Sequence, residues 1–123
     1  MNAFNMAKTA YANSSAPTRT PRSIEYDAFA QITHRLKSAS QGDSFTALAA
    51  ALHENNKLWT LLAADVSDKD NALPESLRGR IFYLFEFTAQ HGRKVLRKEA
   101  SVDVLVDINT AIMRGLRSKE GVS

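Results

Sequence analysis

The sequence predicts an all-α protein, an antiparallel helical bundle of four longer helices plus a short N-terminal helix. Apolar residues recur every three or four positions through most of the chain, and β-branched residues do not alternate with polar ones. The connections are short, which favours antiparallel neighbours. With 123 residues the chain is long enough for one domain. We expect a single domain over residues 1–123, with a docking N-terminal helix at 1–12, a linker at 13–20, the bundle at 21–117 and a flexible tail at 118–123.

The expected helix at residues 1–12 is too short to be stable on its own. Phe4 and Tyr11 are seven residues apart and share one helix face, and Met6 adds apolar surface nearby. The segment must therefore dock on something or fray, and fraying is common at the ends of small domains. The Ser- and Pro-containing stretch 13–20 predicts a linker that lets the segment reach across the bundle.

The next two helices have clear boundaries. Pro21 suits a first helical position after the Thr20 cap, and Gly42 ends this second helix. The third helix is expected from Ser44 to Val66 and has the strongest pattern. Its apolar seam with one polar member consists of Phe45, Leu48, Leu52, Asn55, Trp59, Leu62 and Val66. We expect this helix to be central and Trp59 to be mostly buried in the protein alone.

Two further helices complete the predicted bundle. The fourth begins at Pro74 and runs to about Arg97, and the last follows an N-cap at Ser101 and ends near Arg117. The acidic connection before Pro74 is expected to cap helix ends, with Asn71 as a turn residue. The apolar faces of these two helices are made by Leu77, Ile81, Leu84, Phe85, Val102, Leu105, Ile108, Ile112 and Leu116.

The composition excludes several classes of protein. The chain has no cysteine, which excludes a disulfide scaffold, thiol catalysis and a thiolate metal site, and fits the cytoplasm. The longest apolar run is only Ala47 to Leu52, so neither a membrane span nor a signal peptide is expected. A net charge of +3 admits a nucleic acid or an acidic partner without arguing for either.

No motif for catalysis or for a cofactor or metal is present. The histidines His34, His53 and His91 have no metal-ligand spacing. The acidic connection fails the calcium-loop pattern, because a loop starting at Asp68 places Leu73 where glycine is needed. We therefore expect a binding protein rather than an enzyme, with no cofactor and no metal.

Asn55 and Asn109 occupy positions where their helices call for an apolar residue. A buried amide without a partner costs about 1–3 kcal/mol, so each should form hydrogen bonds. One interpretation is an internal network that fixes helix register, in which Asn109 pairs with Asn55 if the third and last helices touch. The other is a set of polar contacts in a partner-binding groove.

Basic residues flank the fourth helix and lie near the end of the last one. A nucleic-acid patch is one interpretation. The other is that cations at a helix C-terminus complement its dipole, since the aromatic residues lie on the apolar face rather than beside the basic cluster. The residues concerned are Arg78, Arg80, Arg93, Lys94, Arg97, Lys98 and Arg114.

Several stretches together resemble the flagellar biosynthesis regulator FlaF family of alphaproteobacteria. They lie at residues 2–11, 18–22, 58–66, 71–74, 77–78 and 108–116, in family order and spacing. The resemblance implies a small cytoplasmic protein needed for flagellin production and flagellum assembly. It also implies action on flagellin after transcription, a pairing with the opposing FlbT regulator, and a role as a flagellin secretion chaperone.

Our leading hypothesis is a monomeric protein that binds the helical terminal segments of flagellin in an apolar groove. Phe45, Leu52, Trp59 and Phe82 are the candidate apolar anchors. The alternative is a translational regulator that contacts flagellin mRNA through the basic residues. The candidate partner-binding residues are Phe4, Met6, Tyr11, Arg22, Asn55, Trp59, Arg78, Phe82, Asn109 and Arg114.

Overall fold

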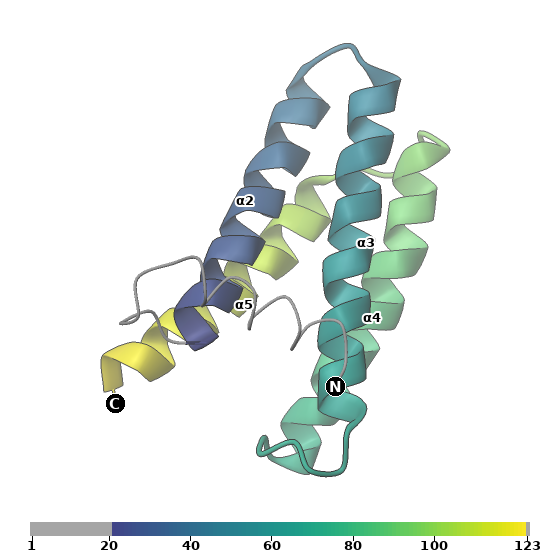
Figure 1. Cartoon of the computed structure of the whole chain (residues 1–123). Helices are drawn as coiled ribbons and strands as arrows, with labels where there is room; N and C mark the ends of the chain where they lie inside the picture. Colours follow the sequence, from purple (N-terminus) through teal and green to yellow (C-terminus); the bar gives the residue numbers. More distant parts are fainter. Residues whose placement is uncertain (1–20, 123) are drawn as a thin grey trace.

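The computed structural model describes the backbone of residues 21–122 and the side chains of residues 25–115. Within this range the chain forms helices and no strand. The helices are α2 (Pro21–Gln41), α3 (Phe45–Ser67), α4 (Glu75–Leu96) and α5 (Asp103–Val122). They run alternately up and down, as Figure 1 shows. The all-α bundle of four longer helices is confirmed, and the short helix expected at residues 1–12 lies outside the described residues, as does the linker.

The capping residues set the helix boundaries close to the predicted ones. α2 begins at Pro21, and the Ser44 side chain accepts a hydrogen bond from the Ala47 N–H at 3.1 Å at the start of α3. Pro74 is the N-cap of α4 rather than its first residue. The Ser101 hydroxyl accepts from the Asp103 N–H at 3.1 Å, and α5 continues to Val122 instead of ending near Arg117.

The end of α4 is closed by a Schellman motif with a lysine at the left-handed position. Lys98 has a φ of 63°, and its N–H donates to the Val95 carbonyl at 3.0 Å. The next N–H, of Glu99, donates to the Lys94 carbonyl at 2.9 Å. Both bonds satisfy carbonyls that the helix end would leave without a partner. This turn directs the chain from α4 toward α5.

Two apolar clusters form the core. Trp59 is fully buried, and its ring lies 5.7 Å from that of Phe29 in an edge-to-face arrangement, so the prediction for Trp59 is confirmed. The first cluster contains Phe29, Leu58, Trp59, Leu62, Val66 and Ile81. The second contains Leu36, Ala51, Leu52, Val95, Val102, Leu105 and Val106. Placing Phe45 in the apolar seam was wrong, because it is the first residue of α3, at the end of the bundle, and is 54% exposed.

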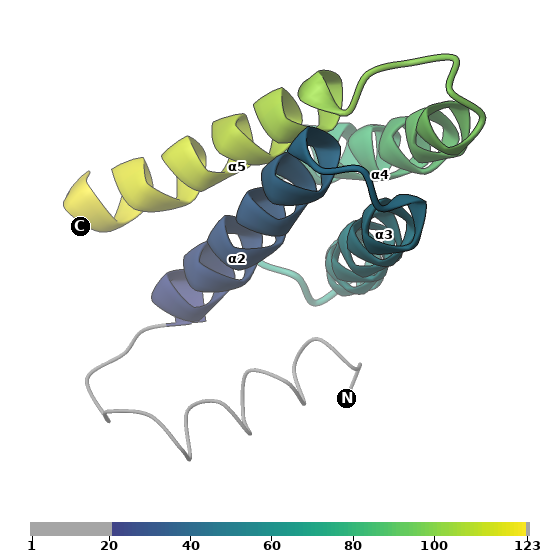
Figure 2. The same cartoon turned by 90° about the horizontal axis from the view of Figure 1, so that it is seen from above.

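The helices are not packed equally closely. α2 packs along both α3 and α5, and α3 packs along α4, whereas α4 and α5 make little contact with each other. Figures 1 and 2 both show the end of α5 leaning away from the start of α4. The bundle is therefore closed along three of its seams and open along the fourth, at the end that carries the α3–α4 connection. None of the described helices has the length and apolar character needed to cross a bilayer.

Candidate partner-binding groove

An open apolar groove of about 500 Å³ lies where α4 and α5 diverge. Its floor is formed by the buried residues Phe29, Leu62 and Val66 of the first core cluster. The α3–α4 connection and α4 form one wall and α5 forms the other, through Leu73, Leu77, Ile81, Ala111, Ile112 and Gly115. The groove thus presents the half-buried apolar side chains of Leu73, Leu77 and Ile112 to a partner, above a floor that is itself buried.

The α5 wall is open because its side chains are small. Ala111 and Gly115 are one helical turn apart and both line the groove. A Cβ atom placed on Gly115 would meet nothing within 4 Å, so space remains above the backbone here. Small residues at this spacing let another helix approach α5 closely. Glu25, Asp65 and Asn71 also line the groove and add two acidic side chains and one amide to a mostly apolar surface.

The α3–α4 connection is held against the end of α3 by its own side chains. The Asn71 amide donates to the Asp65 carbonyl at 3.2 Å, and its oxygen accepts from the Leu73 N–H at 3.0 Å. The Asp68 carboxylate accepts from the Asp70 N–H at 2.9 Å. These bonds confirm the expected capping role and place Leu73 on the groove wall. Among the described residues, no three acidic or histidine side chains are grouped to hold a metal ion.

Asn55, Asn109 and Trp59 form one hydrogen-bonded chain inside the bundle. The Trp59 indole N–H donates to Asn109 Oδ1 at 2.9 Å, and Asn109 Nδ2 donates to Asn55 Oδ1 at 2.7 Å. Asn109 is fully buried and Asn55 is 2% exposed. The internal network is confirmed, including the predicted pairing of the two asparagines. None of the three residues lines the apolar groove.

The other candidate partner-binding residues lie in different places. Phe82 is 41% exposed on α4, with its ring 5.7 Å from that of Phe85. Arg78 is half-buried, and its Nε has no hydrogen-bond partner in the described part of the chain. Arg114 is exposed on α5 beside the groove residue Gly115. Phe4, Met6 and Tyr11 and the side chain of Arg22 fall outside the described residues.

The groove residues Leu73, Ala111 and Gly115 were not identified from the sequence as candidates. Alanine and glycine carry no apolar signal of their own, and Leu73 lies outside any helical stripe. The one signal available was the spacing of Ala111 and Gly115, two small residues one turn apart next to the apolar face of α5.

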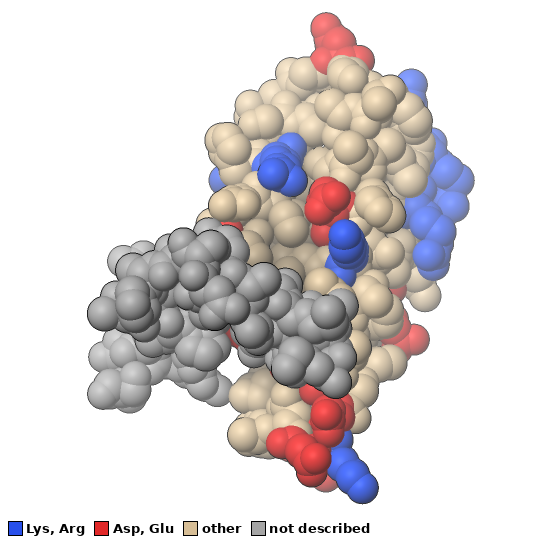
Figure 3. All heavy atoms as spheres, viewed as in Figure 1, with Lys and Arg blue, Asp and Glu red and all other residues tan. Residues whose placement is uncertain are grey.

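The basic cluster lies at the opposite end of the bundle from the groove. Arg93 and Lys94 occupy the last turn of α4, where cations complement the helix dipole. Arg97 forms an exposed ion pair with Glu99 at 2.9 Å. Figure 3 shows Lys and Arg side chains gathered on one side of the upper half, and several acidic side chains at the lower end. The charged residues that line the groove are Glu25 and Asp65, and the exposed Arg114 lies beside it, so its edge carries charges of both signs.

Comparison with known proteins identifies a family. The model of the family described as flagellar protein FlaF matches residues 7–116 of this chain. No curated protein and no solved structure matches it. The matched residues include every residue that lines the apolar groove and all three members of the buried hydrogen-bonded chain. The chain therefore belongs to the flagellar protein FlaF family.

Proposed function

We propose that this FlaF-family protein is a flagellin-binding chaperone in the cytoplasm. It holds the helical terminal segments of newly made flagellin in the apolar groove and so promotes flagellin production and secretion after transcription. The observation that supports the proposal best is the open groove between α4 and α5, whose walls present the half-buried apolar residues Leu73, Leu77 and Ile112. Membership of a flagellar protein family supports the choice of flagellin as the partner.

The groove suits an amphipathic helix better than a polar ligand. Helix-in-groove binding buries apolar side chains spaced one turn apart against a matching apolar surface. Burying a Leu, Ile or Phe side chain completely contributes about 1.5–3 kcal/mol, part of which is offset by the ordering of the partner. In this proposal such anchors pack against the half-buried apolar residues Leu73, Leu77 and Ile112 of the groove walls.

In this proposal residues 1–12 act on the groove in one of two ways. They either cover it in the free protein, as a cover, or hold flagellin in it once bound, as a clamp. The linker at 13–20 reaches up to about 26–29 Å when extended, so Phe4, Met6 and Tyr11 can be carried to the groove, which includes Glu25 near the start of α2. A cover competes with flagellin, and its deletion tightens binding. A clamp adds contacts, and its deletion weakens binding. Calorimetry of full-length and truncated protein distinguishes the two, with a thermal melt to check folding.

The rival is a translational regulator that binds flagellin mRNA through basic residues of α4, its C-terminal end and α5, namely Arg78, Arg80, Arg93, Lys94, Arg97 and Arg114. Contacts to several phosphates weaken steeply as salt rises, whereas burial in an apolar groove does not. Arg93, Lys94 and Arg97 lie at the opposite end of the bundle from the groove, so variants of these three leave the groove intact. FlbT is a second candidate protein partner and is tested in the same way.

The test is calorimetry of the full chain with purified flagellin and, separately, with the untranslated RNA of the flagellin message, each at low and high salt. We expect flagellin to bind with a dissociation constant that changes little with salt, and the RNA not to bind specifically. Specific, strongly salt-dependent binding of the RNA without binding of flagellin would replace this proposal with the rival.

A further inference from the structure

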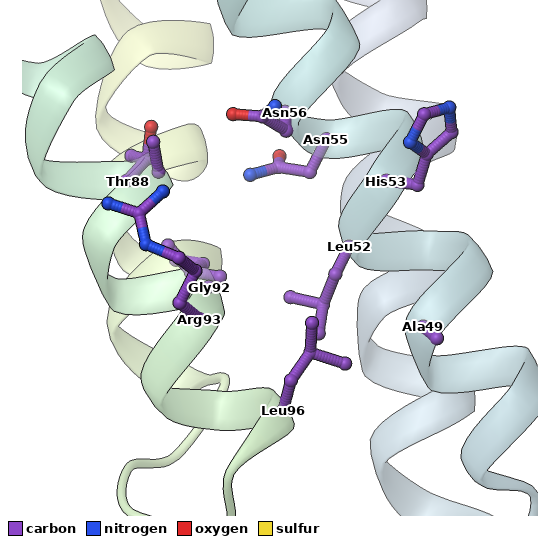
Figure 4. Close-up of a pocket in the computed structure, with 11 residues that line it drawn as sticks. Ala49, Leu52, His53, Asn55, Asn56, Thr88, Gly92, Arg93 and Leu96 are labelled. Carbon is purple, nitrogen blue, oxygen red and sulfur yellow. The ribbon is translucent and has the colours of Figure 1, made fainter.

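A second, polar pocket of about 220 Å³ lies between α3 and α4, away from the apolar groove. The two share no lining residue. Figure 4 shows the polar pocket, with Asn55 and Asn56 on one side and Thr88 and Arg93 on the other. No Asp or Glu residue lines it. Beside its apolar residues, its polar groups are two amides, the Thr88 hydroxyl, the His53 imidazole and the Arg93 guanidinium.

The buried hydrogen-bonded chain ends in this pocket and has a fixed direction. An indole N–H can only donate, so the group of Asn109 that faces Trp59 must be its oxygen. The Asn109 amide nitrogen then faces Asn55 and requires the Asn55 oxygen as acceptor. The Asn55 amide nitrogen is consequently the end of the chain, and its N–H groups are left to donate elsewhere. The donor-only indole thus determines the orientation of both amides.

Asn55 Nδ2 is aimed into the pocket from a side chain that is only 2% exposed. In Figure 4 this nitrogen points into the gap between the helices, toward the side of α4 that carries Thr88 and Arg93. No described residue accepts a hydrogen bond from it. The Thr88 hydroxyl already donates to the Phe85 carbonyl at 2.9 Å. The Thr88 oxygen is therefore left as an acceptor, and the pocket's N–H donors come from Asn55 on its floor and Arg93 at its mouth.

We infer that this pocket binds a carboxylate, supplied by an Asp or Glu side chain of a protein partner. One carboxylate oxygen accepts from Asn55 Nδ2 and the other from the Arg93 guanidinium, which is a charge-assisted bond. The volume is below the 300–1,000 Å³ or so of pockets that take drug-sized ligands, which fits a single inserted side chain. A neutral amide has one oxygen and no negative charge to pair with the Arg93 guanidinium, so we expect it to bind more weakly.

Binding of a ligand in the pocket should alter the hydrogen bonds of the core residues Asn109 and Trp59. Hydrogen bonds in series polarise one another, so an anion on Asn55 strengthens the Asn109 bond and then the Trp59 bond. Trp59 is the single tryptophan of the protein, so its indole N–H gives one unambiguous resonance. Trp59 and Asn109 line neither the polar pocket nor the apolar groove, and Asn109 is hydrogen-bonded to the pocket residue Asn55.

The test is a nuclear magnetic resonance titration of the ¹⁵N-labelled full chain at constant ionic strength. The probe is glutamic acid capped as N-acetyl and N-methylamide, and the matched neutral probe is capped glutamine. We expect capped glutamate to shift the Asn55 side-chain amide and the Trp59 indole N–H saturably, in the millimolar range. Capped glutamine should shift neither. The titration contains no flagellin, so its outcome is independent of the proposed function.

Two charge variants locate the site. Arg93→Gln should weaken binding of capped glutamate by about tenfold or more, since it removes the charge-assisted donor. Lys94→Gln removes the same charge from a neighbouring exposed position that does not line the pocket, and should leave the dissociation constant unchanged within about twofold. Absence of a saturable shift, an equal response to capped glutamine, or equal weakening by the two variants would overturn the inference.

Discussion

The middle of the bundle and its open end are built on different principles. In the middle, the indole of Trp59 and the amides of Asn55 and Asn109 connect α3 to α5 through bonds of 2.9 and 2.7 Å. At the open end, the same two helices contribute Leu62 and Ile112 to an apolar groove that α4 does not close. The first region is held together by buried polar groups, and the second is an apolar groove.

The difference shows what each kind of contact can specify. Hydrogen bonds tolerate only a narrow range of distance and angle. The buried hydrogen bonds among Trp59, Asn109 and Asn55 therefore fix the register of α3 against α5. Apolar contacts are non-directional, and the helices can diverge without leaving a polar group unpaired. A bundle fixed in its middle can therefore keep an apolar end open to a partner.

The largest loss of stability in the middle region is expected when the side chain of Trp59 is removed. Trp59→Ala should lower the free energy of unfolding by about 3–5 kcal/mol, because it leaves a cavity beside Phe29 and removes the donor to Asn109. Urea denaturation followed by far-ultraviolet circular dichroism measures this change. A loss below about 1 kcal/mol would mean that Trp59 does not pack as described.

Removing the central amide should have a smaller effect of the same sign. Asn109→Leu leaves the Trp59 N–H without an acceptor and Asn55 Oδ1 without a donor, which should cost about 2–3 kcal/mol. Asn56→Leu is the control, since it makes the same change at an exposed position and should stay within about 0.5 kcal/mol. Equal stability of the two variants in urea would contradict a structural role for the network.

A substitution at the open end should raise the free energy of unfolding instead of lowering it. Gly115→Ala should stabilise the protein by about 0.5–1 kcal/mol, because the new Cβ meets nothing within 4 Å and alanine is the better helix former. Gly79→Ala, on α4 and also without a neighbour within 4 Å, is the matched control and should give a similar gain. A melting temperature lowered by Gly115→Ala alone would mean that α5 is closed against a neighbour at the groove.

The sequence was sufficient to predict the middle of the bundle but not its open end. A polar residue in an apolar stripe demands a partner, so the pairing of Asn55 with Asn109 could be predicted from their positions in the two stripes. Ser44 and Ser101 likewise showed where helices begin. These inferences rest on local rules that hold in every helical protein.

The groove could not be predicted because it depends on the angle between α4 and α5. That angle results from packing against α2 and α3, and no single residue encodes it. Phe45 shows the same limitation, since its position in the stripe predicted burial and its place at the end of α3 left it exposed. The extent of α5 was underestimated because the residues after Arg117 carry no apolar pattern.

The most direct measurement of the central claim is the affinity for flagellin of two matched variants. Ala111→Glu places a carboxylate on the α5 wall of the groove, and Ala64→Glu places one on α3 outside the groove; both positions are exposed, so both variants should fold. By calorimetry we expect Ala111→Glu to weaken flagellin binding by about tenfold or more, because the charge must be buried against an apolar helix, and Ala64→Glu to leave it unchanged. Equal affinities for the two variants, with both folded, would contradict the groove as the flagellin-binding site.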